Sequence, residues 1–339
     1  MHEKLTPLDI ANEAALREDK DRATQKSPEF LESIKGLRAV IDNLKKKQGD
    51  PSGEGKNIRP LLLILSGGLT GPYATAQTLA LKKMGFGKTF SQVVGISTGV
   101  AVAGYFLADN PELGETIYEE DLVKPEFYNP KRIHKLIDVN FAIKTMSEGP
   151  KMLDLETIAN NPTEFWAQAV NERTGQPELI NAKTAKQGIL QAMHASMALP
   201  FLYNKKIAVN NDRYVDGGLD PLPIERIISQ FNPTDILVLP NMSFVEAQNI
   251  QSSTGERWLE KLSVFFPENK SMLIKKIADR RAAFWRSEQK AKDIQGINIG
   301  ILWPPSGGLS VVGQDAGKMR AAFIDTAEET VKKFQETMS

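Results

Sequence analysis

The pentapeptide Gly95-Ile96-Ser97-Thr98-Gly99 places a nucleophilic hydroxyl between two residues that lack a side chain. This G-x-S-x-G spacing is typical of a nucleophile elbow, in which a serine stands at the apex of a sharp turn from a strand to a helix. Glycine at 95 and 99 lets the strand and the helix pack closely around that bend. The pattern predicts Ser97 as a nucleophile, with an ordinary structural turn as the alternative.

The flanking residues supply the strand and the helix that such a turn needs. Residues 90–94 form a short apolar run that predicts a buried strand, and residues 100–109 are rich in alanine and valine and favour a helix. Thr98 then opens the helix, where free N–H groups and the positive end of the helix dipole favour a developing oxyanion.

A similar unit precedes the elbow. The continuous apolar run 61–65 predicts a fully buried strand, and residues 73–84 favour a helix. Between them lies the glycine-rich stretch Ser66-Gly67-Gly68-Leu69-Thr70-Gly71. The two units together predict a right-handed βαβ arrangement with both loops at the same sheet edge. A phosphate loop is the weaker alternative, because the G-x-x-x-x-G-K-[ST] pattern is absent.

The rest of the chain predicts further elements of an α/β domain. Strands are expected at 206–209, 213–215, 235–239 and 297–302, and helices at 153–158, 164–170, 184–198, 223–230 and 316–338. Asp216-Gly217-Gly218 follows the predicted hairpin directly. By itself, this tripeptide favours an ordinary Asp-Gly turn.

Taken together, these stretches resemble the patatin-like phospholipases over roughly residues 58–240. The matching motifs are Ser66–Gly71, Gly95–Gly99, Ala195-Ser196-Met197-Ala198-Leu199-Pro200-Phe201 and Tyr214–Pro223. The resemblance implies a three-layer α/β/α fold with a mostly parallel sheet. It also implies a dyad in which Ser97 is the nucleophile and Asp216 the base. The implied oxyanion hole uses N–H groups of Gly67, Gly68 and Leu69, assisted by Thr98, with motif support from Ser66, Gly71, Gly95, Gly99, Gly217 and Gly218.

The glycine loop departs from the family pattern of three glycines, a variable residue, Arg or Lys, and glycine. Ser66 stands at the first glycine and Thr70 at the basic position. Losing the cation affects how the loop is fixed more than the type of reaction. A free aspartate, with a pKa near 3.9, is a weak base for a hydroxyl, so we expect burial to raise the pKa of Asp216 and a direct bond to align it with Ser97.

The histidines argue against a Ser-His-Asp triad. The chain has three, His2, His134 and His194, and none follows Asp216, as α/β-hydrolase order requires. We expect His194 to be structural or to line the pocket, and His134, in the basic stretch 131–135, to lie on a solvated face.

Composition excludes several classes of protein. The 42 basic and 42 acidic residues cancel, unlike the basic excess of nucleic-acid binders, and the absence of cysteine excludes disulfides and thiolate zinc sites. No ligand cluster indicates a metal or cofactor. Neither a signal peptide nor a run of ~18 apolar residues is evident, so we expect a cytoplasmic protein. The triplet Asn241-Met242-Ser243 matches a glycosylation sequon, without a secretion signal to support it.

The chain divides into a helical arm with a linker, residues 1–57, and the main domain, residues 58–339. The arm either packs on the domain or covers the site or mediates self-association. Residues 270–293 form an amphipathic pattern rich in Lys and Arg. Such a helix either makes peripheral contact with anionic lipid or packs on its own domain with its charges in solvent.

The function that this resemblance implies is hydrolysis of acyl esters in lipids, as by a phospholipase A or lipid acyl hydrolase, with a lipid or other acyl ester as the expected binding partner. A carboxylesterase or thioesterase for small acyl groups is one alternative. A catalytically weak lipid-binding member of the fold is another, suggested by Ser66 and Thr70. Head group, acyl position, chain length, oligomeric state and the role of residues 1–57 stay open.

Overall fold

The computed structural model describes residues 27, 31, 34–49, 54–129, 131–132, 136–200, 202–203, 205–249, 288, 294–311 and 313–336. Most of the predicted arm and, apart from Glu288, the predicted amphipathic helix at 270–293 lie outside the described residues.

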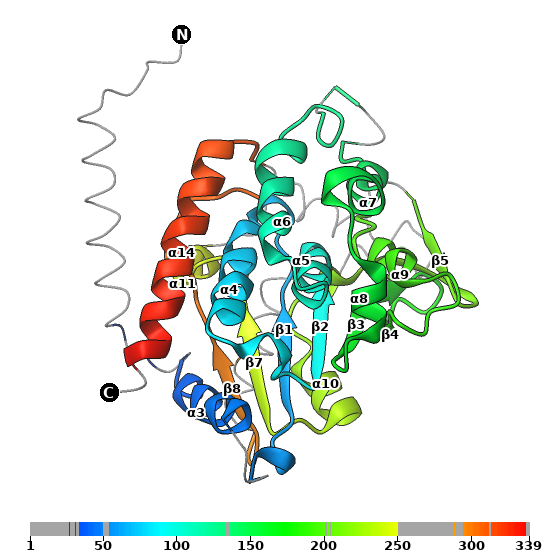
Figure 1. The fold of residues 1–339 in the computed structure, drawn as a ribbon. Coiled ribbons are helices and arrows are strands. Elements are labelled where there is room, and N and C mark those ends of the chain that lie inside the picture. Colours follow the sequence, from blue (N-terminus) through cyan, green and yellow to red (C-terminus); the bar gives the residue numbers. More distant parts are fainter. Residues whose placement is uncertain are drawn as a thin grey trace, which may run out of the picture.

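The domain is built on an eight-stranded sheet that is parallel in its centre (Figure 1). The parallel strands, in spatial order, are β3 (Glu164–Asn171), β2 (Gln92–Ile96), β1 (Pro60–Ile64), β7 (Asp235–Leu239) and β8 (Asn298–Ile301). Strands β4 (Pro177–Asn181) and β6 (Asp212–Asp216) pair antiparallel with β3, and β5 (Ile207–Val209) pairs with β6. Because the parallel strands run together, the loops that follow β1 and β2 meet at one edge.

Helices cover both faces of the sheet, which gives three layers. Leu62 and Ile64 of β1 join a core with α4 (Pro72–Lys83) and α5 (Thr98–Leu107). Leu61 and Leu63 join the opposite core with α10 (Ile224–Phe231) and α11 (Phe244–Asn249). A strand buried on both faces is expected to be apolar throughout, as residues 61–65 are. The predicted three-layer α/β/α fold is confirmed.

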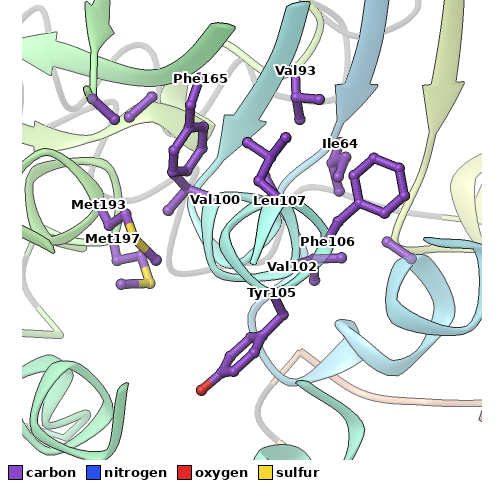
Figure 2. Close-up of a cluster of buried hydrophobic side chains, with 14 of the residues drawn as sticks. Ile64, Val93, Val100, Val102, Tyr105, Phe106, Leu107, Phe165, Met193 and Met197 are labelled. Carbon is purple, nitrogen blue, oxygen red and sulfur yellow. The ribbon is translucent and has the colours of Figure 1, made fainter. Parts of the chain in front are cut away.

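Helix α5 is the centre of the first core (Figure 2). Phe106 and Leu107 face the strands beside Val93, and Met193 and Met197 flank the helix, whereas Tyr105 points away from the sheet. Almost every residue of α5 is buried, as expected for a helix that is apolar all round. This packing fixes the first turn of α5, and with it the elbow.

The remaining helices surround this frame. They are α3 (Leu37–Gln48), α6 (Pro111–Thr116), α7 (Val139–Ser147), α8 (Leu155–Asn160), α9 (Ile189–Ser196) and α14 (Ala316–Glu336). Short helical turns span Glu54–Asn57, Gly68–Thr70, Phe86–Lys88, Gly149–Lys151 and Gly217–Leu219, and a π-helix spans Ile117–Asp121. Within the predicted arm, α3 buries Val40, Ile41 and Leu44 and packs against β8, so this part lies on the main domain (Figure 1).

One predicted helix is wrong. Residues 164–170 form strand β3, not a helix. Phe165, Ala167 and Ala169 belong to one core, whereas Trp166 packs on the other side against Phe231, which is the alternation of a strand. The pattern was missed because β3 is buried on both faces and contains alanine and glutamine, which do not favour strands locally.

Two other elements differ from the prediction. The helix expected at 184–198 begins only at Ile189, because Gly188 before it has a φ of +87° and is not helical. Strand β4 was not predicted from the sequence. Along the described ranges, no helix combines the length and the apolar character that crossing a bilayer requires.

Candidate active site

Ser97 lies at a strained turn between β2 and α5. Its φ of 53° and ψ of −122° are unusual for a residue with a side chain, and it is 6% exposed. A Cβ at Gly95 would lie 2.4 Å from the Cα of Val100, and one at Gly99 would lie 2.3 Å from the carbonyl oxygen of Ile64. Both glycines are therefore required for this turn, which has the strand–turn–helix geometry of a nucleophile elbow.

Asp216 meets Ser97 directly, although 119 positions separate them. The Ser97 hydroxyl donates to Oδ2 of Asp216 at 2.7 Å, and the Gly218 N–H donates to Oδ1 at 2.7 Å. Asp216 ends β6 and is 2% exposed. A Cβ at Gly217 would lie 2.0 Å from the carbonyl oxygen of Gln168, so the turn after Asp216 also depends on glycine. The carboxylate is thus held with one oxygen on the backbone and the other on the serine.

A second polar connection runs behind this pair through Ser196. The backbone N–H of Ser97 donates to Oγ of Ser196 at 2.9 Å, and that hydroxyl donates to the carbonyl oxygen of Gln168 at 2.6 Å. The side chain of Gln168 in turn donates to the carbonyl oxygen of Gly217. The sequence motif contained Ser196, but nothing in its spacing indicated that its hydroxyl would hold the elbow.

The glycine loop lies between β1 and α4. Within the described part of the chain, the N–H groups of Gly67 and Gly68 have no backbone acceptor, whereas the N–H of Leu69 donates to the carbonyl oxygen of Val311 at 2.9 Å. Gly68 has a φ of +60°. The three predicted donors therefore differ, because two have no backbone acceptor among the described residues and the third is occupied by a residue far along the chain.

The other predicted motif residues pack around the loop. A Cβ at Gly218 would lie 3.0 Å from the Ser66 side chain, so the loop and the Asp-Gly-Gly turn touch. A Cβ at Gly71 would lie 2.1 Å from the ring of Tyr118. The Tyr118 hydroxyl lies 2.5 Å from Oγ1 of Thr98, and burial raises the pKa of Tyr118 to about 12. This tyrosine, which the sequence analysis did not single out, joins the loop to the elbow helix.

A narrow apolar cavity opens beside Ser97. Its walls come from α5, α6, the π-helix, the loop before α7, and α7 itself. The lining includes Gly68, Leu69, Ser97, Thr98, Ala101, Val102, Tyr105, Gly114, Tyr118, Phe127, Ile137, Val139, Ala142, Met146 and Val311. Such a cavity suits an unbranched hydrocarbon chain better than a charged or strongly polar group.

His194 lies in a separate polar group. Its Nε2 is 2.7 Å from the Tyr203 hydroxyl, which donates to Asn140. Burial, together with the charge of Lys205, lowers the pKa of His194 to about 4, so the imidazole is neutral near pH 7. The side chain that accepts the hydrogen bond from the Ser97 hydroxyl is Asp216. His2 and His134 lie outside the described residues.

The fold and the motifs define an α/β protein with a serine elbow at the carboxyl edge of a mostly parallel sheet. The family model for patatin-like phospholipases matches residues 63–237, more than half of the chain. The chain belongs to the patatin-like phospholipase family.

Two other proteins are similar to parts of this chain. The uncharacterized protein YjjU of Escherichia coli K12 is 24% identical over 178 residues, which cover 50% of this chain and 49% of YjjU. The chain thus spans about half the length of this relative. The crystal structure of VipD from Legionella pneumophila aligns with a TM-score of 0.48 at 10% identity, over 82% of this chain and 67% of VipD.

Proposed function

We propose that the protein is a serine acyl-ester hydrolase that acts on lipids through a Ser97–Asp216 dyad. The observation that carries this proposal is the 2.7 Å hydrogen bond from the Ser97 hydroxyl to Oδ2 of Asp216, at a strained elbow beside an apolar cavity. Nucleophile and base are within direct reach, which is the first geometric requirement for covalent catalysis.

In the first half of the reaction, Oγ of Ser97 attacks the ester carbonyl carbon while its proton passes to Oδ2 of Asp216. The carbonyl oxygen becomes an oxyanion, for which the free N–H groups of Gly67 and Gly68 are the donors, assisted by the first turn of α5 at Thr98. The C–O bond then breaks, the alcohol leaves with the proton from Asp216, and the acyl group stays on Ser97.

In the second half, a water molecule attacks the acyl-enzyme. Asp216 takes one proton from the water, and the oxygen forms a bond to the acyl carbon. When the bond to Ser97 breaks, the proton returns to Oγ and the fatty acid is released. The carboxylate of Asp216 therefore acts as base and then as acid in each half of the reaction. Ser97 alone could not accept and return these protons.

The apolar lining supports a long acyl chain over a small acyl group. Each buried methylene contributes ~0.8 kcal/mol, so an acyl chain that fills the cavity gains binding free energy with every carbon. A carboxylesterase or thioesterase for small groups would leave most of this surface unused.

The test is hydrolysis of p-nitrophenyl esters of increasing acyl length by wild type and Ser97→Ala, with labelling by a fluorophosphonate. We expect turnover to rise with chain length and to fall at least ~10³-fold in Ser97→Ala, with the label on Ser97 alone. Lipid binding without turnover or labelling would instead identify the catalytically weak binder.

The cavity itself is tested by Ala142→Leu, a change on α7 in its wall. We expect the kcat/KM for long-chain esters to fall ~10–100-fold while short esters are hydrolysed as before, because the added atoms take the space of acyl carbons. The short ester is the control within the same variant. An unchanged ratio of long to short substrates would show that the acyl chain lies elsewhere.

A further inference from the structure

Asn241 connects the two sides of the glycine loop. It follows β7 at the carboxyl edge of the sheet and is 1% exposed. Its Nδ2 donates to the carbonyl oxygen of Leu65 at 2.6 Å, and its Oδ1 accepts from the N–H of Ala74 at 3.1 Å. One side chain thus joins the end of β1 to the first turn of α4. Its burial is incompatible with the glycosylation that its sequon suggests.

Thr70 adds a second connection within the loop. Its hydroxyl lies 2.9 Å from the carbonyl oxygen of Gly67 and 2.5 Å from that of Asn241, and the residue is 5% exposed. A Cβ at Gly67 would lie 2.4 Å from both Cβ of Asn241 and Oγ1 of Thr70. The loop therefore rests directly on these two side chains.

The contact at Gly67 orients a catalytically relevant donor. The carbonyl of Gly67 and the N–H of Gly68 belong to one planar trans peptide, so they point in opposite directions. The Gly67 carbonyl accepts from the backbone N–H of Thr70 at 3.2 Å and lies 2.9 Å from the Thr70 hydroxyl, so the Gly68 N–H points away from Thr70 within the same peptide plane. Gly68 lines the cavity together with Ser97. The hydroxyl at position 70 thus adds to the backbone contact that orients the proposed oxyanion donor, although Thr70 is not among the residues that line the cavity.

We propose that Thr70 and Asn241 are positioning residues that form an uncharged clamp on the glycine loop, in place of the cation that the family pattern has at position 70. This inference rests on the proposed function, because it assigns the loop to oxyanion binding. It explains how Thr70 is compatible with activity. The groups that the clamp engages are backbone carbonyls and an N–H, and all are neutral.

The first experiment compares Thr70→Val, which removes the hydroxyl at nearly constant shape, with Thr70→Ser, which keeps it. We expect the kcat of Thr70→Val to fall ~10–100-fold with KM nearly constant, and Thr70→Ser to retain turnover within about threefold. Thr70→Lys, which restores the family residue, is expected to be less active than wild type. Equal kcat in the Val and Ser variants, or a gain with Lys, would overturn the clamp.

A second readout does not require turnover. Hydrogen exchange in the peptide spanning residues 65–71 is measured by mass spectrometry in the same variants. We expect faster exchange there in Thr70→Val only, with the rest of the chain unchanged. Unchanged exchange in this peptide, or faster exchange throughout the molecule, would contradict a local clamp. If Thr70→Val showed this local increase in exchange but the wild-type protein had no Ser97-dependent turnover, the clamp would be retained and the proposed hydrolase rejected.

Discussion

Two buried aspartates lie at opposite ends of the parallel strands. Asp216 is 2% exposed and Asp235, at the start of β7, is fully buried. Asp235 accepts from Nδ2 of Asn43 at 2.9 Å and of Asn298 at 2.8 Å, and from the Thr234 hydroxyl at 2.7 Å. Asp216 accepts from a backbone N–H and from the Ser97 hydroxyl.

Both carboxylates are therefore buried and hydrogen-bonded. They differ in the chemical groups that donate to them. Amides and a threonine tie Asp235 to its neighbours on α3 and β8 and hold the strand edge together. Asp216 instead faces a hydroxyl on a residue with a φ of 53°, beside an apolar cavity. Backbone strain next to a cavity is where functional groups concentrate. We therefore expect the reactivity proposed for Asp216 to depend on the Ser97 hydroxyl that it contacts.

The largest expected effect is that of Asp216→Asn on turnover. The amide keeps the shape but cannot accept a proton, so we expect kcat to fall ~10³–10⁴-fold. Combining it with Ser97→Ala is expected to cost little more than either change alone, because the two residues act as a unit. The kcat values for ester hydrolysis by wild type, the two single variants and the double variant measure this coupling. Full additivity would mean that the two side chains act in separate steps.

Asp235→Ala is expected to lower the stability of the fold and to leave turnover nearly unchanged. It leaves two half-buried amides, those of Asn43 and Asn298, without an acceptor, so the free energy of unfolding should fall by ~2–4 kcal/mol, while kcat per folded molecule stays within about twofold. Urea denaturation measures the first quantity and active-site titration the second. If the folded variant lost turnover, the two edges of the sheet would not be independent.

The smallest expected effect is that of His194→Gln. Because the pKa of His194 is lowered from 6.5 to about 4, the unfolded chain binds this proton at higher pH than the folded chain. Protonation of His194 therefore favours the unfolded chain, and the free energy of unfolding falls as the pH drops from 6.5 towards 4. Above pH 6.5 the histidine is neutral in both states and this effect is absent. The variant should lose less thermal stability across that range than wild type.

The turnover of His194→Gln provides the matching control. We expect its pH–rate profile to follow that of wild type, since the imidazole bonds to Tyr203 and not to the dyad. A profile displaced by this change would make the histidine part of the catalytic machinery.

The sequence predicted the parts of the fold in which local pattern and burial agree. The apolar runs 61–65 and 236–239 lie in or next to the buried strands β1 and β7, as predicted. The elbow at Ser97 was predictable because the G-x-S-x-G spacing is a local pattern, although the glycine at 99 is required by contact with the backbone of Ile64 on the neighbouring strand β1. Strand β3 was mistaken for a helix because its partners, not its own residues, determine its conformation.

The clamp and the Ser196 connection could not be predicted from the sequence for a related reason. Asn241 is 171 positions from Thr70, and Ser196 is 99 from Ser97. Their amide and hydroxyl groups are common residue types whose role depends on what folding brings next to them. The resemblance to a family supplied Asp216, which its own tripeptide did not distinguish from an ordinary turn.

The bond from the Leu69 N–H to Val311 has a consequence for the order of assembly. It closes the glycine loop across more than 240 residues, and the partner emerges from the ribosome long after every motif has been made. The stretch matched by the family model, residues 63–237, includes neither Asn241 nor Val311. Contacts of such high order form late in folding, so the nascent chain carries an incomplete loop until its last strand and helix have docked.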